Sequence, residues 1–221
     1  MKYNYLLFDL DGTLTDPMIG ITKSVAYSLK RMRHMDVPLE ELTRFIGPPL
    51  KNSYMDYYGF TEEESDEAIE LFRDYFKDTG IYENELYPGI KELLGDLKKS
   101  GKALCVATSK PTVFAKQIMT HFGLEEYFTY VYGSNLDGTR TKKAEVIVAV
   151  LDKIGIEDRA EVIMIGDREH DIKGAKEERI DSIGVEYGYG NYEELNNAGA
   201  DHIVSSVEAL RALLMDKHPS G

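Results

Sequence analysis

The sequence predicts an α/β fold, a doubly wound parallel sheet that carries an inserted α-helical cap domain. Two observations predict this fold. Short apolar runs alternate with amphipathic stretches of helical period along most of the 221 residues, a pattern typical of parallel sheets covered by helices on both faces. One long segment, residues 17–83, interrupts the alternation because it contains helical patterns and no convincing strand.

The strands and helices of the sheet domain are predicted from their apolar spacing. Strands are expected at residues 3–9, 103–109, 128–133, 162–167, 181–187 and 201–205. Helices are expected between them at residues 89–101, 112–123, 143–155 and 169–180. Three of these helices close on Gly101, Gly123 and Gly155, as carboxyl-terminal caps do.

The interrupting segment is expected to form a separate helical cap domain over residues 17–83, with the α/β core made of residues 1–16 and 84–221. Its helical stretches are residues 20–32, 39–45, 50–59 and 62–80, and a Gly-Pro-Pro break stands at residues 47–49. The alternative is a long helical crossover packed permanently on the sheet.

Composition excludes several classes of function. The formal net charge of −13 argues against binding to a nucleic-acid polymer or an anionic membrane, but a local cationic site could still bind a small anion. The one cysteine, Cys105, lies in an apolar run and is expected to be a buried structural thiol. No leader-like segment and no apolar run near the ~20 residues of a membrane span is found, so we expect a cytoplasmic protein.

Polar residues stand where the predicted strands end, which is where open α/β sheets bind ligands. The pair Asp9 and Asp11 follows the first strand, and a lysine opens the helix at residue 143. The remaining candidates after the other strands are Thr108, Ser109, Lys110, Asp167 and Asp171. Three or four carboxylates, a hydroxyl and a lysine at one edge suit Mg²⁺, a hard ion that prefers oxygen ligands, whereas no Cys/His cluster is present for zinc.

Each of these motifs is weak by itself. An Asp-x-Asp pair can cap a turn, and a Thr-Ser-Lys run is usually a helix start. A lysine in the first turn of a helix is normally solvated. Lys142 and Lys110 are alternatives to Lys143 as the phosphate-binding lysine. A functional site is indicated because all four motifs occur in this order, each at the end or start of the appropriate element.

Taken together, "FDLDGTL", "VATSK", the lysine of "KAEVI" and "IGDREHD" resemble the four motifs of the haloacid dehalogenase-like hydrolase superfamily. The resemblance covers nearly the whole chain, and the helical insert lies where that superfamily has its bundle-type cap. In addition, "FIGPPL" and "GVEYGYGNYEELNNAGAD" resemble the phosphoglycolate-phosphatase-like and 5'-nucleotidase-like branch.

The resemblance implies roles for the carboxylates. Asp9 is expected to attack phosphorus and form an aspartyl-phosphate, and Asp11 to protonate the leaving alcohol and then activate water. Mg²⁺ is expected on Asp9, the backbone carbonyl of Asp11 and Asp167, with Asp171 orienting the shell. The implied activity is Mg²⁺-dependent hydrolysis of a small phosphomonoester, the protein's small-metabolite partner.

The resemblance also implies which residues bind the phosphoryl group and the rest of the substrate. Thr108, the Ser109 amide and Lys143 are expected to bind phosphoryl oxygens, with Lys110 as a further substrate-binding residue. Arg44, beside the Gly-Pro-Pro turn of the insert, is the candidate for binding the leaving group; the alternative for Arg44 is an ordinary surface arginine.

Competing functions remain open at this point. Asp11 argues against a dehalogenase, because a halide leaves without a proton, and no lysine of the insert has a context that suggests the Schiff base of a phosphonate hydrolase. A phosphomutase resembling β-phosphoglucomutase shares every core motif. A catalytically idle phosphate-binding module is the alternative from another class.

Overall fold

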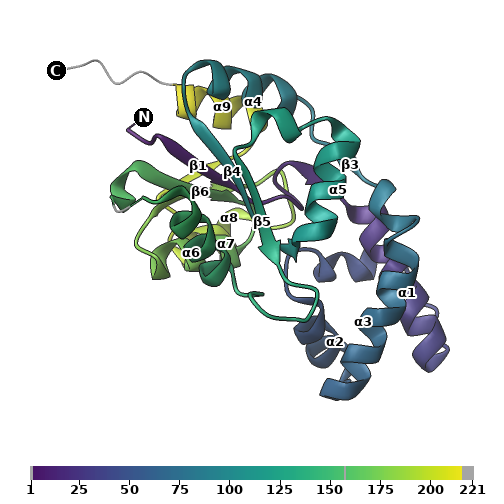
Figure 1. The fold of residues 1–221 in the computed structure, drawn as a ribbon. Coiled ribbons are helices and arrows are strands. Elements are labelled where there is room, and N and C mark those ends of the chain that lie inside the picture. Colours follow the sequence, from purple (N-terminus) through teal and green to yellow (C-terminus); the bar gives the residue numbers. More distant parts are fainter. Residues whose placement is uncertain (1, 157, 216–221) are drawn as a thin grey trace. The chain divides into compact units, whose positions relative to one another are not determined.

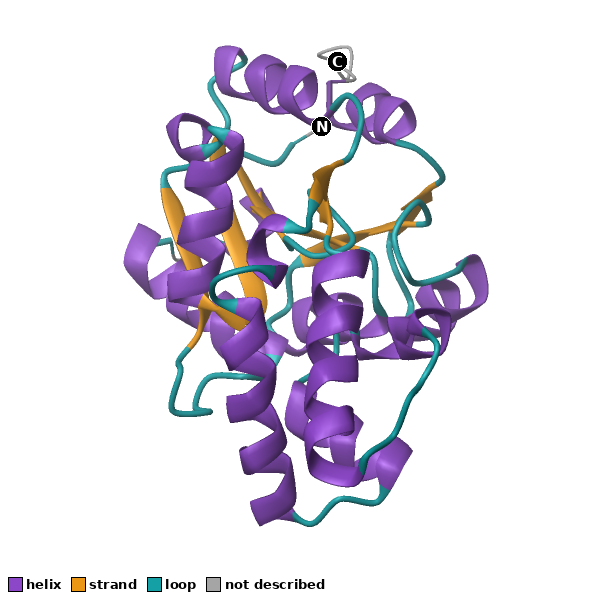
Figure 2. Cartoon of the chain, turned by 90° about the vertical axis from the view of Figure 1, so that its right-hand side faces the viewer, coloured by secondary structure: helices purple, strands orange, loops and turns teal. Residues whose placement is uncertain are grey.

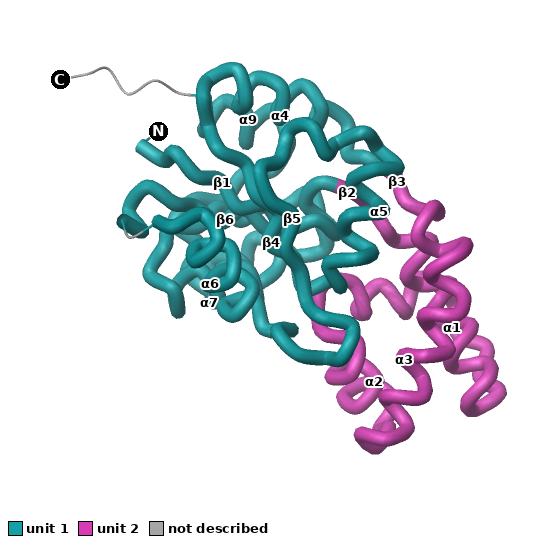
Figure 3. Tube along the Cα trace, in the orientation of Figure 1, with its two compact units in different colours: residues 1–14, 86–221 teal, residues 15–85 magenta. Residues whose placement is uncertain are grey.

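Figure 1 shows the computed structural model, which describes residues 2–156 and 158–215. The described chain forms two compact units (Figure 3): an α/β unit built from the chain up to residue 14 and from residue 86 onward, and a helical unit of residues 15–85. No helix among the described residues is long and apolar enough to cross a lipid bilayer.

A parallel sheet forms the centre of the α/β unit. In the described chain its six strands are β1 (Tyr5–Phe8), β4 (Ala103–Pro111), β5 (Tyr130–Ser134), β6 (Val162–Gly166), β7 (Asp181–Val185) and β8 (His202–Val204). Their spatial order is β5-β4-β1-β6-β7-β8, and every neighbouring pair is parallel. The predicted fold class is therefore confirmed.

Helices cover both faces of this sheet (Figure 1), as the buried strands require. They are α4 (Ile90–Lys99), α5 (Thr112–Phe122), α6 (Lys143–Ile154), α7 (Glu169–Glu177), α8 (Tyr192–Ala198) and α9 (Val207–Met215). Alternate strand residues point to one face, where Leu7, Cys105 and Met164 form one core cluster with apolar residues of α6 and α7. Cys105 is buried and free, as expected of a structural thiol.

The order of the strands determines where a ligand can bind. From β1 the chain moves to β4 and β5 on one side, and it then returns to β6, β7 and β8 on the other. The carboxyl ends of β1, β4 and β6 therefore flank the point where the winding direction reverses, the usual binding crevice of open α/β sheets.

The helical unit consists mainly of helices, drawn in purple in Figure 2. Its elements are β2 (Thr15–Asp16), α1 (Met18–Arg33), η1 (Leu39–Phe45), α2 (Leu50–Tyr58), α3 (Glu62–Phe76) and η2 (Gly80–Tyr82). Helices α1 and α3 pack against each other, and Phe45, Tyr54 and Phe60 form an aromatic core with ring centroids 5.1–5.5 Å apart. That this unit works as a cap stays a prediction.

Several elements differ from those expected. Residues 39–45 form a 3-10 helix, and two-residue strands, β2 and β3 (Glu85–Leu86), pair where the chain passes between the units. Strand β4 runs on to Pro111, two residues beyond the expected end at residue 109, so Lys110 lies within the strand together with Thr108 and Ser109. Helices α8 and α9 were not expected, and both are short, with seven and nine residues.

Candidate active site

Three carboxylates meet at the carboxyl ends of β1 and β6. Asp9 follows β1, Asp167 follows β6, and Asp171 lies in the first turn of α7. All three side chains are buried, and one oxygen from each lies within 4.8 Å of the other two. Asp9 and Asp167 lie close together because β1 and β6 are paired side by side: Phe8 pairs with Ile165, and the Asp9 amide donates a hydrogen bond to the Ile165 carbonyl.

Lys143 supplies the cation that this group contacts. It is the first residue of α6, and its Nζ lies 2.9 Å from Asp9 Oδ1 and 2.8 Å from Asp171 Oδ1. The same Nζ donates to the Ala107 carbonyl at 2.9 Å. Burial lowers the pKa of Lys143, but the Asp171 and Asp9 carboxylates outweigh it, so the pKa is raised and the ammonium is held. Lys142 is exposed, so the geometry favours Lys143.

The cluster carries more negative charge than Lys143 neutralises, since three carboxylates face one ammonium. Burial, followed by the Asp171 and Asp9 charges, raises the pKa of Asp167 well above its usual range. Burial also raises the pKa of Asp171 to about 6, against the lowering effect of Lys143. Asp167 Oδ1 is buried and has no hydrogen-bond partner. A hard divalent cation fits this set of oxygens, because it would neutralise the surplus charge and occupy the unpartnered oxygen.

Asp11 has its own cationic partner, which sequence reasoning missed. Lys110 Nζ lies 2.8 Å from Asp11 Oδ2, and the two side chains are only 6% and 10% exposed. Burial raises the pKa of Asp11, and the Lys110 ammonium opposes the rise. Asp11 Oδ1 is buried without a hydrogen-bond partner. Asp9 and Asp11 can therefore both be buried although they are only two residues apart, because each is paired with a different lysine.

Strand β4 positions the third motif through an irregularity. Its pairing with β5 shifts register between Ala107 and Pro111, and such a bulge re-aims the side chains around it. Thr108 is buried, and its hydroxyl accepts a hydrogen bond from the Lys110 amide at 3.2 Å. Ser109 is half-buried. The α/β unit thus brings the Thr108 segment to the edge where the carboxylates lie.

Arg44 is the one predicted site residue outside the α/β unit. It is exposed in the helical unit, and its guanidinium lies 4.3 Å from the ring centroid of Tyr57 and 5.4 Å from that of Tyr58. Its role in substrate binding stays a prediction.

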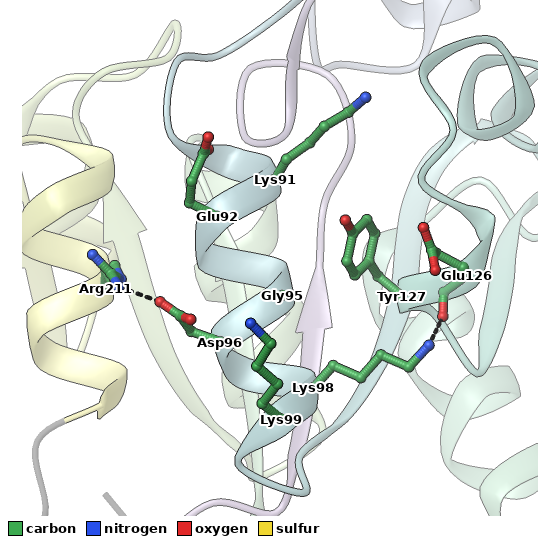
Figure 4. Close-up of a pocket in the computed structure, with 9 residues that line it drawn as sticks. All are labelled: Lys91, Glu92, Gly95, Asp96, Lys98, Lys99, Glu126, Tyr127 and Arg211. Atoms are coloured by element: carbon green, nitrogen blue, oxygen red, sulfur yellow. Dashed lines mark hydrogen bonds and ion pairs between the residues drawn. The ribbon is translucent and has the colours of Figure 1, made fainter.

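A separate groove lies along α4 (Figure 4). It has a volume of about 740 Å³ and is lined by Lys91, Glu92, Gly95, Asp96, Lys98, Lys99, Glu126, Tyr127 and Arg211. Its charged side chains are already paired in part: Arg211 contacts Asp96, and Lys98 donates to the Glu126 carbonyl. None of the predicted site residues lines this groove.

Comparison with known families identifies the class of protein. The family model described as haloacid dehalogenase-like hydrolase matches residues 6–185. The chain belongs to this family, which confirms the predicted family and the prediction that the chain is a hydrolase. A solved structure described as a predicted phosphatase from Clostridium acetobutylicum is 53% identical, covers 96% of this chain and 98% of its own, and superposes with a TM-score of 0.94.

Curated relatives carry three different names. A 5'-nucleotidase of Pseudomonas aeruginosa is 46% identical over 214 residues, which are 97% of this chain and 96% of that protein. A tyrosine-protein kinase PtkA of Mycobacterium tuberculosis is 34% identical over 95% of this chain and 72% of its own length. A phosphoglycolate phosphatase of Vibrio vulnificus is 30% identical over 93% of each chain. The chain is thus similar both to phosphatases and to a protein named as a kinase.

Proposed function

We propose that the protein is a Mg²⁺-dependent phosphatase that hydrolyses a small phosphomonoester through an aspartyl-phosphate on Asp9. The observation that carries the proposal is the Asp9 carboxylate, buried and held by Lys143 beside Asp167, at the edge where α/β sheets bind ligands. The net charge of −13 disfavours a nucleic-acid polymer, and relatives named 5'-nucleotidase and phosphoglycolate phosphatase favour a phosphorylated metabolite as substrate. We expect the protein to act in the cytoplasm.

Two aspartates divide the covalent chemistry. A carboxylate oxygen of Asp9 attacks phosphorus, the bond to the leaving oxygen breaks, and Asp11 gives that oxygen its proton. In the second half, Asp11 takes a proton from water, the resulting hydroxide attacks phosphorus, and the Asp9 carboxylate is released together with inorganic phosphate. The contact between Lys110 and Asp11 holds the proton carrier beside the nucleophile.

The other residues bind charge. Lys143, the Thr108 hydroxyl and the Ser109 amide would hold phosphoryl oxygens and stabilise the charge that develops on them. Asp9, the Asp11 carbonyl and Asp167 would hold Mg²⁺, while Asp171 orients Lys143 through their ion pair. The ion, when bound, supplies positive charge that offsets the repulsion between the carboxylates and the phosphate.

The substrate is expected to be phosphoglycolate-like or nucleotide-like, as the names of two relatives suggest. Arg44 is the residue of the helical unit that we expect to bind a carboxylate or nucleotide group of the substrate. Arg44 is exposed, and its guanidinium lies 4.3 Å from the ring centroid of Tyr57.

Release of inorganic phosphate from a panel of phosphomonoesters, with p-nitrophenyl phosphate as the generic member, tests this function. We expect activity with Mg²⁺, loss of activity in excess chelator, and poor substitution by Ca²⁺, whose larger and looser shell lets Asp9 bind in a non-reactive geometry. Full activity in chelator would refute the metal-dependent mechanism. Formation of an isomeric phosphate ester in place of inorganic phosphate would instead identify a mutase, and transfer of phosphate from added ATP to a tyrosine peptide would identify a kinase.

A further inference from the structure

The turn after β7 contacts Asp167 directly. The Tyr189 amide donates a hydrogen bond to Asp167 Oδ2 at 2.7 Å, and Asp167 Oδ1 is left buried without a partner. The Oδ2 oxygen is thus fixed by the backbone of a later turn, and the Asp167 carboxylate also contributes an oxygen to the cluster with Asp9 and Asp171.

Two glycines let the turn approach this closely. A Cβ on Gly190 would lie 2.0 Å from the Asp167 carbonyl oxygen, and a Cβ on Gly188 would lie 2.2 Å from the Gly12 carbonyl oxygen and 2.5 Å from Asp167 Oδ2. Neither glycine has a φ in the left-handed region. These positions therefore exclude a side chain because of space and not because of backbone conformation.

Glu194 holds the residues that follow Asp167. Its Oε1 accepts hydrogen bonds from Arg168 Nε at 2.8 Å and from the Glu169 amide at 2.9 Å. Glu194 is itself placed by a helix cap, since the Asn191 side chain accepts from the Glu194 amide at 3.0 Å. The carboxylate thus binds both the side chain and the backbone of the turn that joins β6 to α7.

We propose that residues 188–194 are a positioning element that holds the Asp167 carboxylate in the orientation needed to bind a divalent cation. The Tyr189 amide fixes one oxygen, the glycines permit that contact, and Glu194 fixes the turn that carries Asp167. The inference rests on the proposed Mg²⁺ site, and it assigns a role to a segment that contains none of the reacting groups.

Calorimetric titration of Mg²⁺ into the full chain, freed of metal by EDTA and dialysis, tests the inference. We expect Gly190→Ala and Glu194→Ala each to weaken Mg²⁺ binding at least fivefold. Their circular dichroism in EDTA is expected to match that of the unaltered protein. The matched controls are Gly95→Ala, where a Cβ meets nothing closer than 3.9 Å, and Glu193→Ala, which removes the same charge from an exposed neighbour.

The outcomes separate this inference from the proposed function. If the unaltered protein binds no Mg²⁺, the proposed metal-dependent function fails. If it binds Mg²⁺ but the folded variants lose less than fivefold in affinity, or lose no more than their controls, the positioning role is overturned. Should Gly190→Ala fail to fold, Glu194→Ala decides alone, because it opens space and introduces no clash.

Discussion

Lys143 is the residue that allows buried carboxylates to lie so close together. Its side chain is 3% exposed, and its ammonium contacts Asp9 and Asp171 at 2.8–2.9 Å. An unpaired buried charge is strongly unfavourable, whereas a paired and hydrogen-bonded one is tolerated. Lys143 therefore stabilises the α/β unit, and we propose that it also binds a phosphoryl group.

Replacing this lysine should lower both stability and activity. We expect Lys143→Ala to decrease the free energy of unfolding by about 3–5 kcal/mol, because it leaves buried carboxylates without their partner, and to abolish phosphatase activity. Urea denaturation followed by circular dichroism measures the change. Lys142→Ala removes the same charge from an exposed neighbour and is expected to change stability by less than about 0.5 kcal/mol. If Lys142→Ala lost as much stability and activity as Lys143→Ala, the assignment of the phosphate-binding role to Lys143 would be contradicted.

Contacts between side chains of distant segments could not be predicted from the sequence. The motifs placed Lys110 and Asp11 at the same edge of the sheet, but their ion pair could not be predicted, because Lys110 lies where the pairing of β4 with β5 shifts register. The amide of Tyr189 carries no signal in a sequence, because every non-proline residue has one. Only the close spacing of Gly188 and Gly190 could have indicated that the backbone after β7 approaches another segment closely.

At the scale of single elements, α3 shows how a local signal specifies a helix. Thr61 accepts a hydrogen bond from the Glu64 amide at 3.2 Å, and the Glu64 carboxylate accepts one from the Thr61 amide at 2.8 Å. This reciprocal pair is a capping box, which satisfies two amides that have no partner inside the helix.

Removal of this cap is expected to destabilise the helical unit. Thr61→Ala should lower its free energy of unfolding by about 1 kcal/mol, because the exposed hydroxyl contributes through the cap. Thermal denaturation compares it with Thr79→Ala, an exposed threonine that precedes η2 without a side-chain cap bond. A loss from Thr79→Ala as large as that from Thr61→Ala would contradict the role of the capping box.

Elements with long, regular patterns were predictable, and short ones were not. Strands β1, β4, β6 and β7 follow from runs of mostly buried residues, as expected for a parallel sheet covered on both faces, and β5 and β8 from short apolar runs that are half-buried. The two-residue strands β2 and β3 carry no detectable period. The 3-10 geometry of residues 39–45 was not predicted, because the apolar spacing of so short a helix suits either helix type.

At the scale of the whole molecule, the fold collects a site from four distant segments. Asp9, Thr108, Lys143 and Asp167 come from different strands or helices, and the reversal of winding around β1 brings their elements to one edge. The net charge of −13 does not by itself exclude an anionic substrate, because Lys143, Lys110 and a bound divalent cation would offset the negative charge of the site's carboxylates.

The most direct test of the central claim, that Asp9 is the nucleophile and Asp11 the proton carrier, is acid-quenched mass spectrometry with p-nitrophenyl phosphate as substrate. Asp11→Asn should release a burst of p-nitrophenol and then turn over slowly, with phosphate on the peptide that contains Asp9, because the phenolate leaves readily while water lacks its base. With an alkyl ester, Asp11→Asn should form this intermediate about 10²–10⁴-fold more slowly than the unaltered protein does. Asp9→Asn should show neither burst nor bound phosphate. A burst and a labile phosphate in Asp9→Asn, with none in Asp11→Asn, would contradict the account by reversing the two roles.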